Sequence, residues 1–201
     1  VNQTLYKKVN FDPRVDLVGI TMIAKVPLVF LANPATGIKS MGDLVTKARA
    51  EPGKLSYASA GIGGTQHLSA EMVKARAKLQ LEHIPYKGSG PAQADFLGNQ
   101  VPLMVDSVTA ALANIQAGKA VPLGVTSTTR SSQLPNVPTI AESGLPEFKG
   151  FEAVGWLGLM APKGTPQAIV DKLNQETTAI LNSAEMQKFI RDRGSEPAPT
   201  T

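Results

Sequence analysis

Short apolar stretches alternate with amphipathic ones over the first 126 residues of the chain. The apolar stretches are rich in β-branched residues and have the length of strands, whereas the segments between them place apolar residues at helical spacing, as at Leu68, Met72 and Ala75. This pattern predicts strands at residues 17–24, 26–32, 55–59, 79–86, 101–105 and 121–126, and helices at residues 40–53, 65–78, 91–97 and 108–117.

The regular succession of strands and helices predicts an α/β fold. Repeated strand–helix units favour a parallel sheet with helices on both faces. We therefore expect residues 32–127 to contain a largely parallel sheet, with a glycine-rich turn that opens a helix at about Thr65.

The pattern changes after Ser127, where loops at residues 131–138 and 144–146 precede a long predicted strand at 151–161. A helix that begins at 165–166 is expected to carry one apolar side, and a last helix runs from residue 184 to Gly194. The residues of that apolar side are Ile169, Leu173, Ile180 and Leu181. Three aromatic residues on or just before the long strand are expected in the core: Phe148, Phe151 and Trp156.

Composition and charge exclude several classes of protein without changing this fold. The hydrophobic fraction of 42% and the charged fraction of 18% are ordinary for a globular protein. The longest apolar runs are too short to span a bilayer, and residues 1–4 lack the features of a signal peptide. The absence of cysteine excludes disulfides and thiol catalysis. The net charge of +4 mildly favours anionic partners, but no run of basic residues indicates a nucleic-acid surface.

Three strand-to-helix junctions of the predicted sheet are small and polar. Ligands of open parallel sheets bind outside the carboxyl ends of the strands, where helix N-termini supply free N–H groups. We therefore expect a site for a small carboxylate, with no cofactor and no metal. Its candidate residues are Ser59, Gly61, Ile62, Gly63, Gly64, Thr65, Gln66 and His67 at the first junction, Ser89 at the second and Asp106 at the third.

Each junction also has a purely structural explanation. A glycine-rich turn between a strand and a helix often does no more than reverse the chain. Asp106 is equally suited to cap the following helix, and as a carboxylate it would repel an acidic ligand; ordering water or pairing with a ligand ammonium or hydroxyl group are its other expected roles. His83, in a predicted strand, is more often a packing residue than a ligand. The glycines match no dinucleotide fingerprint, because Gln66 takes the place of the third glycine.

The sequence predicts a binding protein and not an enzyme. Residues 58–61 resemble a nucleophile elbow, but Tyr57 stands where the first glycine of that motif belongs. A hydrolase of that type needs a histidine after its acid, and both His67 and His83 precede Asp106. A hydrolase is therefore the third choice. With two histidines and no close grouping of His, Asp and Glu, a metal site is not expected.

Several segments together resemble the Bug-type receptors, the substrate-binding proteins of tripartite tricarboxylate transporters. The resemblance covers essentially the whole chain, and the combination of segments is specific although no single one is. It is carried by Leu5–Lys8 with Phe11–Pro13, Pro52–Gly61, His67-Leu68, His83–Gly88, Val105-Asp106, Ala117–Lys119, Leu134–Thr139, Gly144–Pro146, Trp156 and Ala161–Pro166.

The resemblance implies a periplasmic-binding-protein fold of the second type. Such proteins have two lobes, each with a central, mainly parallel sheet flanked by helices, and hold a ligand between the lobes. Residues 27–152 would form the complete second lobe, and residues 1–26 a remnant of the first lobe with the first crossing strand. Residues 153–201 would supply the second crossing strand and C-terminal helices of the first lobe. The first lobe is then incomplete, and its own glycine-rich ligand loop lies outside this numbering.

The resemblance also implies a periplasmic receptor that binds a small carboxylate and works with the membrane subunits of its transporter, without nucleic acid as a partner. The alternative is the effector-binding domain of a transcription regulator with the same fold. The apolar helix side at Ile169, Leu173 and Ile180 lacks part of the sheet that it needs. We expect it to be covered by another copy of the chain, by exchanged segments or by polypeptide outside this numbering.

Overall fold

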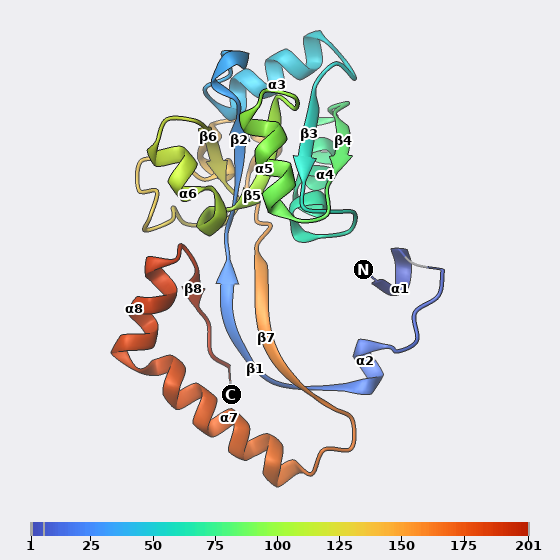
Figure 1. The fold of residues 1–201 in the computed structure, drawn as a ribbon, viewed down its shortest axis with the longest axis vertical. Coiled ribbons are helices and arrows are strands. Elements are labelled where there is room, and N and C mark those ends of the chain that lie inside the picture. The colour runs from blue at the N-terminus through green and yellow to red at the C-terminus, as the bar shows by residue number, and fades with distance from the viewer. Residues whose placement is uncertain (1, 6, 201) are drawn as a thin grey trace. The chain divides into compact units, whose positions relative to one another are not determined.

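The computed structural model describes residues 2–5 and 7–200, and contacts within the chain divide it into two units (Figure 1). Unit 1 comprises residues 1–26 and 155–201, and unit 2 comprises residues 27–154. The chain therefore leaves unit 1 after Val26 and returns to it at Gly155. Each unit has its own sheet and its own hydrophobic core.

Unit 2 is built on a five-stranded sheet with the order β4-β3-β5-β2-β6 (Figure 1). Strand β3 pairs parallel with β4 and β5, whereas β2 pairs antiparallel with β5 and β6. The largely parallel sheet is thus confirmed, with β2 as its antiparallel exception. The strands are β2 (Leu28–Ala32), β3 (Ser56–Ser59), β4 (Glu82–Pro85), β5 (Leu103–Ser107) and β6 (Val121–Val125).

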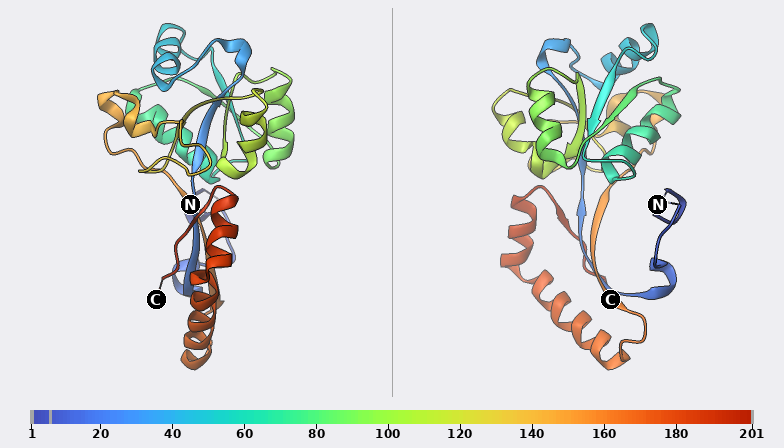
Figure 2. Two further views of the ribbon diagram at one scale, coloured as in Figure 1. Left: turned by 90° about the vertical axis from the view of Figure 1, so that its left-hand side faces the viewer. Right: turned by 45° about the vertical axis from the view of Figure 1, so that its right-hand side comes forward.

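Helices cover both faces of this sheet, as the two views in Figure 2 show. On one face, Leu44 of α3 and Val73 of α4 lie in a core that also holds Phe148; on the other, Phe96 of α5 and Val108 of α6 lie in a second core. The helical elements are η1 (Pro34–Thr36), α3 (Met41–Ala50), α4 (Thr65–Ala77), α5 (Ser89–Leu97), α6 (Val108–Gln116), η2 (Ile140–Ser143) and η3 (Pro146–Phe148).

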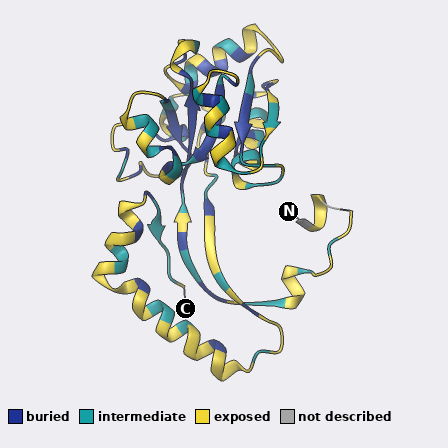
Figure 3. Cartoon of the chain, viewed as in Figure 1, coloured by how far each residue is buried: buried dark blue, intermediate teal, exposed yellow. Residues whose placement is uncertain are grey.

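Strand β2 shows why the sheet is covered on both sides. Side chains of a strand point alternately to opposite faces. Leu28 and Phe30 accordingly enter the first core, and Val29 and Leu31 enter the second. All five residues of β2 are buried, and the central strands of this sheet are among the darkest parts of Figure 3. A continuous apolar run is therefore the signature of a strand in the middle of two layers.

Unit 1 has a three-stranded sheet with the order β7-β1-β8. Strand β1 pairs antiparallel with both neighbours, so this sheet differs from the mainly parallel sheet that the resemblance implied for each lobe. The reason lies in the chain path, because β1 and β7 are successive passes of the chain in opposite directions. The elements are α1 (Asn2–Leu5), α2 (Pro13–Asp16), β1 (Leu17–Val26), β7 (Gly155–Pro162), α7 (Gln167–Asn182), α8 (Ala184–Asp192) and β8 (Glu196–Pro197).

Two small apolar clusters hold unit 1 together. Val170 of α7 packs with Ile20 and Ala161, and Leu181 lies with Ala24 in the second cluster. The single apolar side predicted for α7 is wrong, because it joined Leu181 to three residues that lie outside these clusters. Those residues are 50%, 40% and 55% exposed: Ile169, Leu173 and Ile180, respectively.

The aromatic residues expected in the core behave differently in the two units. Phe148 and Phe151 are fully buried in unit 2, which confirms the prediction for them. Trp156 of β7 is 58% exposed, so its prediction as a core residue is wrong. Most of β7 is exposed, because few described residues of unit 1 cover it.

Candidate functional site

The three predicted junctions meet at one edge of the sheet of unit 2. Strands β3, β4 and β5 run parallel, so their carboxyl ends lie at the same edge, where each strand leads into a helix. The first two junctions are joined by backbone hydrogen bonds: the N–H of Tyr86 donates to the carbonyl of Ser59 (3.0 Å), and the N–H of Gly88 donates to that of Ala60 (3.1 Å). The second and third are joined by the Ser89 hydroxyl, which donates to Asp106 Oδ1 at 2.8 Å.

The first junction is a glycine loop, residues 60–64, between β3 and α4. Gly61 has φ +144° and Gly63 has φ +76°, values that a residue with a Cβ rarely adopts. Gly64, by contrast, has φ −69° and is the N-cap of α4. Ile62 and Thr65 are exposed, and Gly61, Gly63 and Gly64 are half-buried, so the loop is open to solvent.

The three helices that follow the junctions begin differently. α4 follows Gly64 and α5 follows Gly88, and a glycine has no side chain that can accept a hydrogen bond from the first turn. α6 follows Ser107, whose hydroxyl accepts a hydrogen bond from the Ala110 N–H. The N-termini of α4 and α5 therefore keep donor groups and the positive end of the helix dipole, which suits them to an anion.

Asp106 lies inside the structure and not on the surface of the site. It is the fourth residue of β5, and Ser107 caps α6 in place of the cap predicted for Asp106. Its side chain is fully buried, and Oδ1 accepts from the Ser89 hydroxyl and from the Ser107 N–H, both at 2.8 Å. Oδ2 accepts from Gln93 Nε2, also at 2.8 Å. These donors satisfy a carboxylate without a cationic partner, so Asp106 fixes the start of α5 relative to β5.

Gln93 is a member of this network that the sequence analysis missed. Its amide donates to Asp106 and also to the carbonyl of Ala110 on α6 (2.9 Å). Residues four positions apart lie on the same face of a helix, so Ser89 and Gln93 both reach Asp106. That spacing is the signal by which Gln93 could have been found.

Two tyrosine hydroxyls, one on β3 and one directly after β4, donate hydrogen bonds to the helices of the site. Tyr57 Oη donates to Glu71 on α4, and burial together with this bond raises the pKa of Tyr57. Tyr86 Oη donates to Asp95 on α5 at 2.7 Å, and burial followed by this bond raises its pKa to about 12. Both hydroxyls thus remain neutral donors at physiological pH.

The two histidines lie beside the glycine loop. Ser59 is fully buried, and its hydroxyl lies 2.6 Å from His83 Nε2. His67, in the first turn of α4, accepts the N–H of Gly63 at Nδ1. Burial and, to a smaller extent, the nearby His67 lower the pKa of His83 to about 4, so His83 is neutral at physiological pH. His83 is partly buried and stacks between Tyr57 and His67, which fits its prediction as a packing residue.

Metal and membrane features are absent from the part of the chain that the structure describes. No cluster of three or more His, Cys, Asp or Glu residues suited to a metal ion occurs among residues 2–5 and 7–200. Over the same ranges, no helix combines the length and the apolar character needed to cross a bilayer.

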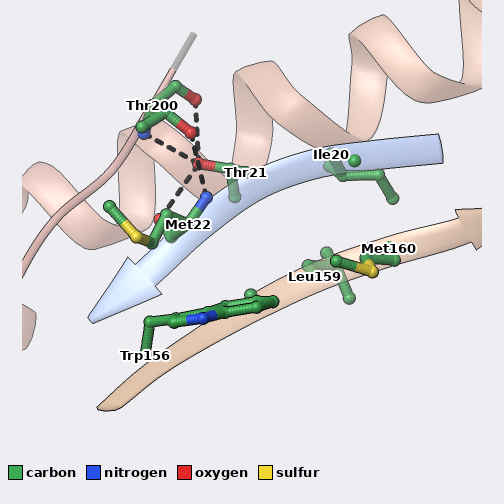
Figure 4. Close-up of a pocket in the computed structure, with 9 residues that line it drawn as sticks. Ile20, Thr21, Met22, Trp156, Leu159, Met160 and Thr200 are labelled. Carbon is green, nitrogen blue, oxygen red and sulfur yellow. Dashed lines mark hydrogen bonds between the residues drawn. The ribbon is translucent and has the colours of Figure 1, made fainter. Parts of the chain in front are cut away.

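A hollow of about 340 Å³ lies in unit 1, beside β1, β7 and the C-terminal segment (Figure 4). The Thr21 hydroxyl donates to the carbonyl of Thr200 at 2.8 Å and thereby holds that segment against β1. None of the predicted site residues lines this hollow. Its lining is largely apolar and consists of Gly19, Ile20, Thr21, Met22, Trp156, Gly158, Leu159, Met160 and Thr200.

Comparison with known proteins identifies the family of this chain. The model of the family described as "Tripartite tricarboxylate transporter family receptor" matches residues 1–200. The chain belongs to this family. This membership confirms the resemblance seen in the sequence, and the family is one of transport receptors and not of enzymes.

Curated relatives extend beyond this chain. It is 40% identical over 98% of its length to a protein of Pseudomonas sp. strain P51, "UPF0065 protein in tcbD-tcbE intergenic region", and 35% identical over 100% to BugT of Bordetella pertussis. The chain spans 58% and 61% of the lengths of these two relatives.

Solved receptor structures share the fold. The structure titled "R. palustris Rpa4515 with adipate" is 35% identical, with a TM-score of 0.89 over 98% of this chain and 64% of that one. The structure of MatC from Rhodopseudomonas palustris with bound malate is 27% identical, with a TM-score of 0.83 over 98% of this chain and 66% of that one. The expected periplasmic-binding-protein fold is therefore confirmed.

Proposed function

We propose that this chain is the ligand-binding part of a periplasmic solute receptor, which captures a small carboxylate at the glycine loop for the membrane subunits of a tripartite tricarboxylate transporter. One observation carries the proposal: helices α4 and α5 each begin directly after a glycine. Both helices follow parallel, neighbouring strands, so their N-termini lie at the same edge of the sheet. Family membership supports the role of a transport receptor over that of a regulator's effector domain.

The physical basis is electrostatic. An anion at an exposed helix N-terminus gains about 0.3–1 kcal/mol, and up to about 2 kcal/mol where the geometry is partly buried. Two such termini together with the amides of the glycine loop match a carboxylate group, which is an acceptor at both oxygens. Adipate and malate, the ligands of the two solved relatives, are small dicarboxylates and support this ligand class.

The proposed ligand contacts are the accessible residues of the site, and the buried ones act behind them. We assign contact with the ligand to Gly61, Ile62, Gly63, Gly64, Thr65, Gln66 and Ser89, and a supporting role to His67, whose Nδ1 accepts the Gly63 N–H. Ser59 and Asp106 are fully buried, so we assign them a supporting role. This arrangement keeps the negative charge of Asp106 bonded to Ser89, Gln93 and Ser107, and not facing an acidic ligand.

Calorimetry on the intact protein with adipate and malate as probes tests the proposal. Gly63→Val forces a β-branched residue into φ +76° and should weaken binding at least about tenfold. Gly118→Val is the matched control, because Gly118 also has a positive φ (+67°) and open space around it. It lies between the end of α6 and the start of β6, and not at the carboxyl end of a strand, where the proposed site lies. Equal affinity of the two folded variants would show that the loop is only a turn.

We further propose that unit 2 corresponds to the second lobe of the receptor and that unit 1 contains parts of the first. Large apolar residues of unit 1 are exposed, including Trp156, Leu157 and Met160. Trp156 and Met160 line the same hollow, and clustered exposed apolar surface of this kind is usually covered by a partner. Because the curated relatives are longer than this chain, we assign the cover to first-lobe polypeptide outside this numbering.

Trp156 is the single tryptophan of the chain and reports on this cover directly. In the 201-residue chain we expect red-shifted tryptophan emission from a monomer, as judged by light scattering. In a protein that carries the first-lobe polypeptide, emission should shift to the blue. Blue emission from a particle of twice the expected mass would show instead that a second copy, or exchanged segments, covers this face.

A further inference from the structure

Three aromatic rings form a stack behind the glycine loop, and anion capture at the backbone does not by itself require them. His67 of α4 stacks on His83 of β4 with ring centroids 4.0 Å apart, and His83 stacks on Tyr57 of β3 at 4.9 Å. The stack therefore connects three elements of unit 2 at the point where the loop begins and ends.

The hydrogen bond of His67 fixes the protonation of its ring. The N–H of Gly63 donates to Nδ1 of His67 at 3.0 Å, so Nδ1 must carry a lone pair and the ring proton must lie on Nε2. The bond joins the loop residue with φ +76° to the first turn of α4. An imidazolium ion would present an N–H at both nitrogens and could not accept it.

His83 supports the opposite end of the loop. Its Nε2 lies 2.6 Å from the Ser59 hydroxyl, which lies 3.2 Å from both the N–H and the carbonyl of Gly61. One arrangement satisfies all three contacts: His83 Nε2–H and the Gly61 N–H donate to Ser59 Oγ, and the hydroxyl proton goes to the Gly61 carbonyl. Both ends of the loop are thus tied to the histidine stack.

On the basis of the proposed function, we propose that His67 is a positioning residue, which holds the glycine loop in its carboxylate-binding conformation only while Nδ1 is unprotonated. Protonation removes the acceptor for Gly63, and the loop loses the bond that defines its last residues. Acid should then weaken carboxylate binding by more than protonation of the ligand itself accounts for.

The charged and titratable groups around the ring fit this assignment. Glu71 lies 3.9 Å from His67 Nε2, beyond hydrogen-bond distance, and its Oε1 already accepts from Tyr57 at 2.7 Å and from Lys74 at 2.6 Å. Burial opposes ionisation of Glu71, but the bonds from Lys74 and Tyr57 outweigh it and lower its pKa. Neutral His83 stacks against the ring on its other side, and Asp106 of β5 is bonded to Ser89 and Gln93.

Two substitutions separate the acceptor from the stack. His67→Asn supplies an amide oxygen in place of Nδ1, keeps an acceptor at every pH and removes the ring. His67→Phe keeps a ring on His83 and removes the acceptor. With adipate as the probe on the intact protein near neutral pH, we expect His67→Asn to bind within about threefold of the parent and His67→Phe at least about tenfold more weakly. As the pH is lowered, both proteins lose the affinity that protonation of adipate removes, and the parent should lose more than His67→Asn.

A reversed order, with His67→Phe binding as the parent does and His67→Asn weakened, would show that stacking matters and overturn the inference. So would an equal loss of affinity in acid for the parent and His67→Asn.

A measurement without ligand separates this inference from the proposed function. By NMR, nitrogen shifts of His67 in the intact protein should show a bare Nδ1, and the Gly63 amide should exchange slowly in the parent and in His67→Asn but quickly in His67→Phe. This pattern without adipate binding would support the positioning role and count against this ligand for the proposed site. Adipate binding with unchanged Gly63 exchange in His67→Phe would overturn the positioning role alone.

Discussion

Units 1 and 2 use similar numbers of apolar side chains per element but bury them very differently. The sheet of unit 2 has helices on both faces and two continuous cores, so its central strands β3, β5 and β2 are mostly buried. The sheet of unit 1 rests on two small clusters, and Trp156, Leu157 and Met160 of β7 remain exposed. All ten predicted site residues belong to unit 2. The comparison teaches that the candidate site rests on the unit whose sheet is covered by larger apolar cores.

The largest expected difference between the units concerns aromatic residues. Phe148→Ala in unit 2 should lower the free energy of unfolding by about 3–5 kcal/mol, because it removes a fully buried ring and leaves a cavity. Trp156→Ala in unit 1 of the 201-residue chain should change it by less than about 1 kcal/mol, because that residue is 58% exposed. Urea denaturation followed by circular dichroism measures both. Equal losses would mean that β7 is covered in solution.

The second-largest difference in stability is expected between a buried and an exposed carboxylate. Asp106→Asn in unit 2 brings an NH₂ group among donors from Ser89, Gln93 and Ser107, and should cost about 2 kcal/mol of stability. The matched change in unit 1 is Asp171→Asn on α7, where the carboxylate accepts from Gln167 on the surface, and its effect should stay within about 0.5 kcal/mol. Denaturation midpoints of the two variants decide the matter. A neutral Asp106→Asn would mean that the buried network does not hold the start of α5.

A smaller effect on the free energy of unfolding is expected from histidine titration. It should arise in unit 2, because both histidines lie there. Burial lowers the pKa of His83 from 6.5 to about 4, so between these values the unfolded chain binds more protons than the folded one. Stability from this group is therefore complete above about pH 6.5 and is lost as the pH falls towards about 4. The partly exposed ring limits the loss to about 1–2 kcal/mol.

His83→Phe should flatten this part of the stability profile, since phenylalanine keeps the stack and cannot titrate. Thermal unfolding of parent and variant across this pH range measures the difference. An identical slope in both proteins would assign the acid sensitivity to another group.

Much of unit 2 could be predicted from periodicity and turn chemistry alone. The glycine-rich stretch ends at Gly64 and α4 begins at Thr65, as predicted, because glycine is common in turns and the helical spacing of apolar residues starts at Thr65. The direction of β2 could not be predicted in this way. A strand that is buried on both faces is apolar at every position, and such a pattern reads the same for a parallel and an antiparallel neighbour.

Errors in the predictions arose where an apolar pattern fits more than one partner. Helix α7 carries two apolar stripes, and spacing alone cannot tell that Val170 and Leu181 face the strands while Ile169 and Ile180 face away. At the site, the sequence placed His67 correctly in the first turn after the glycine loop, but it could not reveal that Asp106 is a buried residue of β5 or which residues contact either side chain. Gln93 and His83 come from other elements, and only the folded sheet brings them into contact.

The central claim, that a carboxylate binds at the glycine loop of unit 2, is tested most directly by amide chemical shifts during a titration of the intact protein with adipate. The account predicts saturable shifts of Gly61, Gly63 and Gly64 and of the first residues of α4 and α5, with Gly118 unchanged. Saturable binding that shifts the residues around Trp156 in unit 1 and leaves the glycine loop unmoved would contradict it.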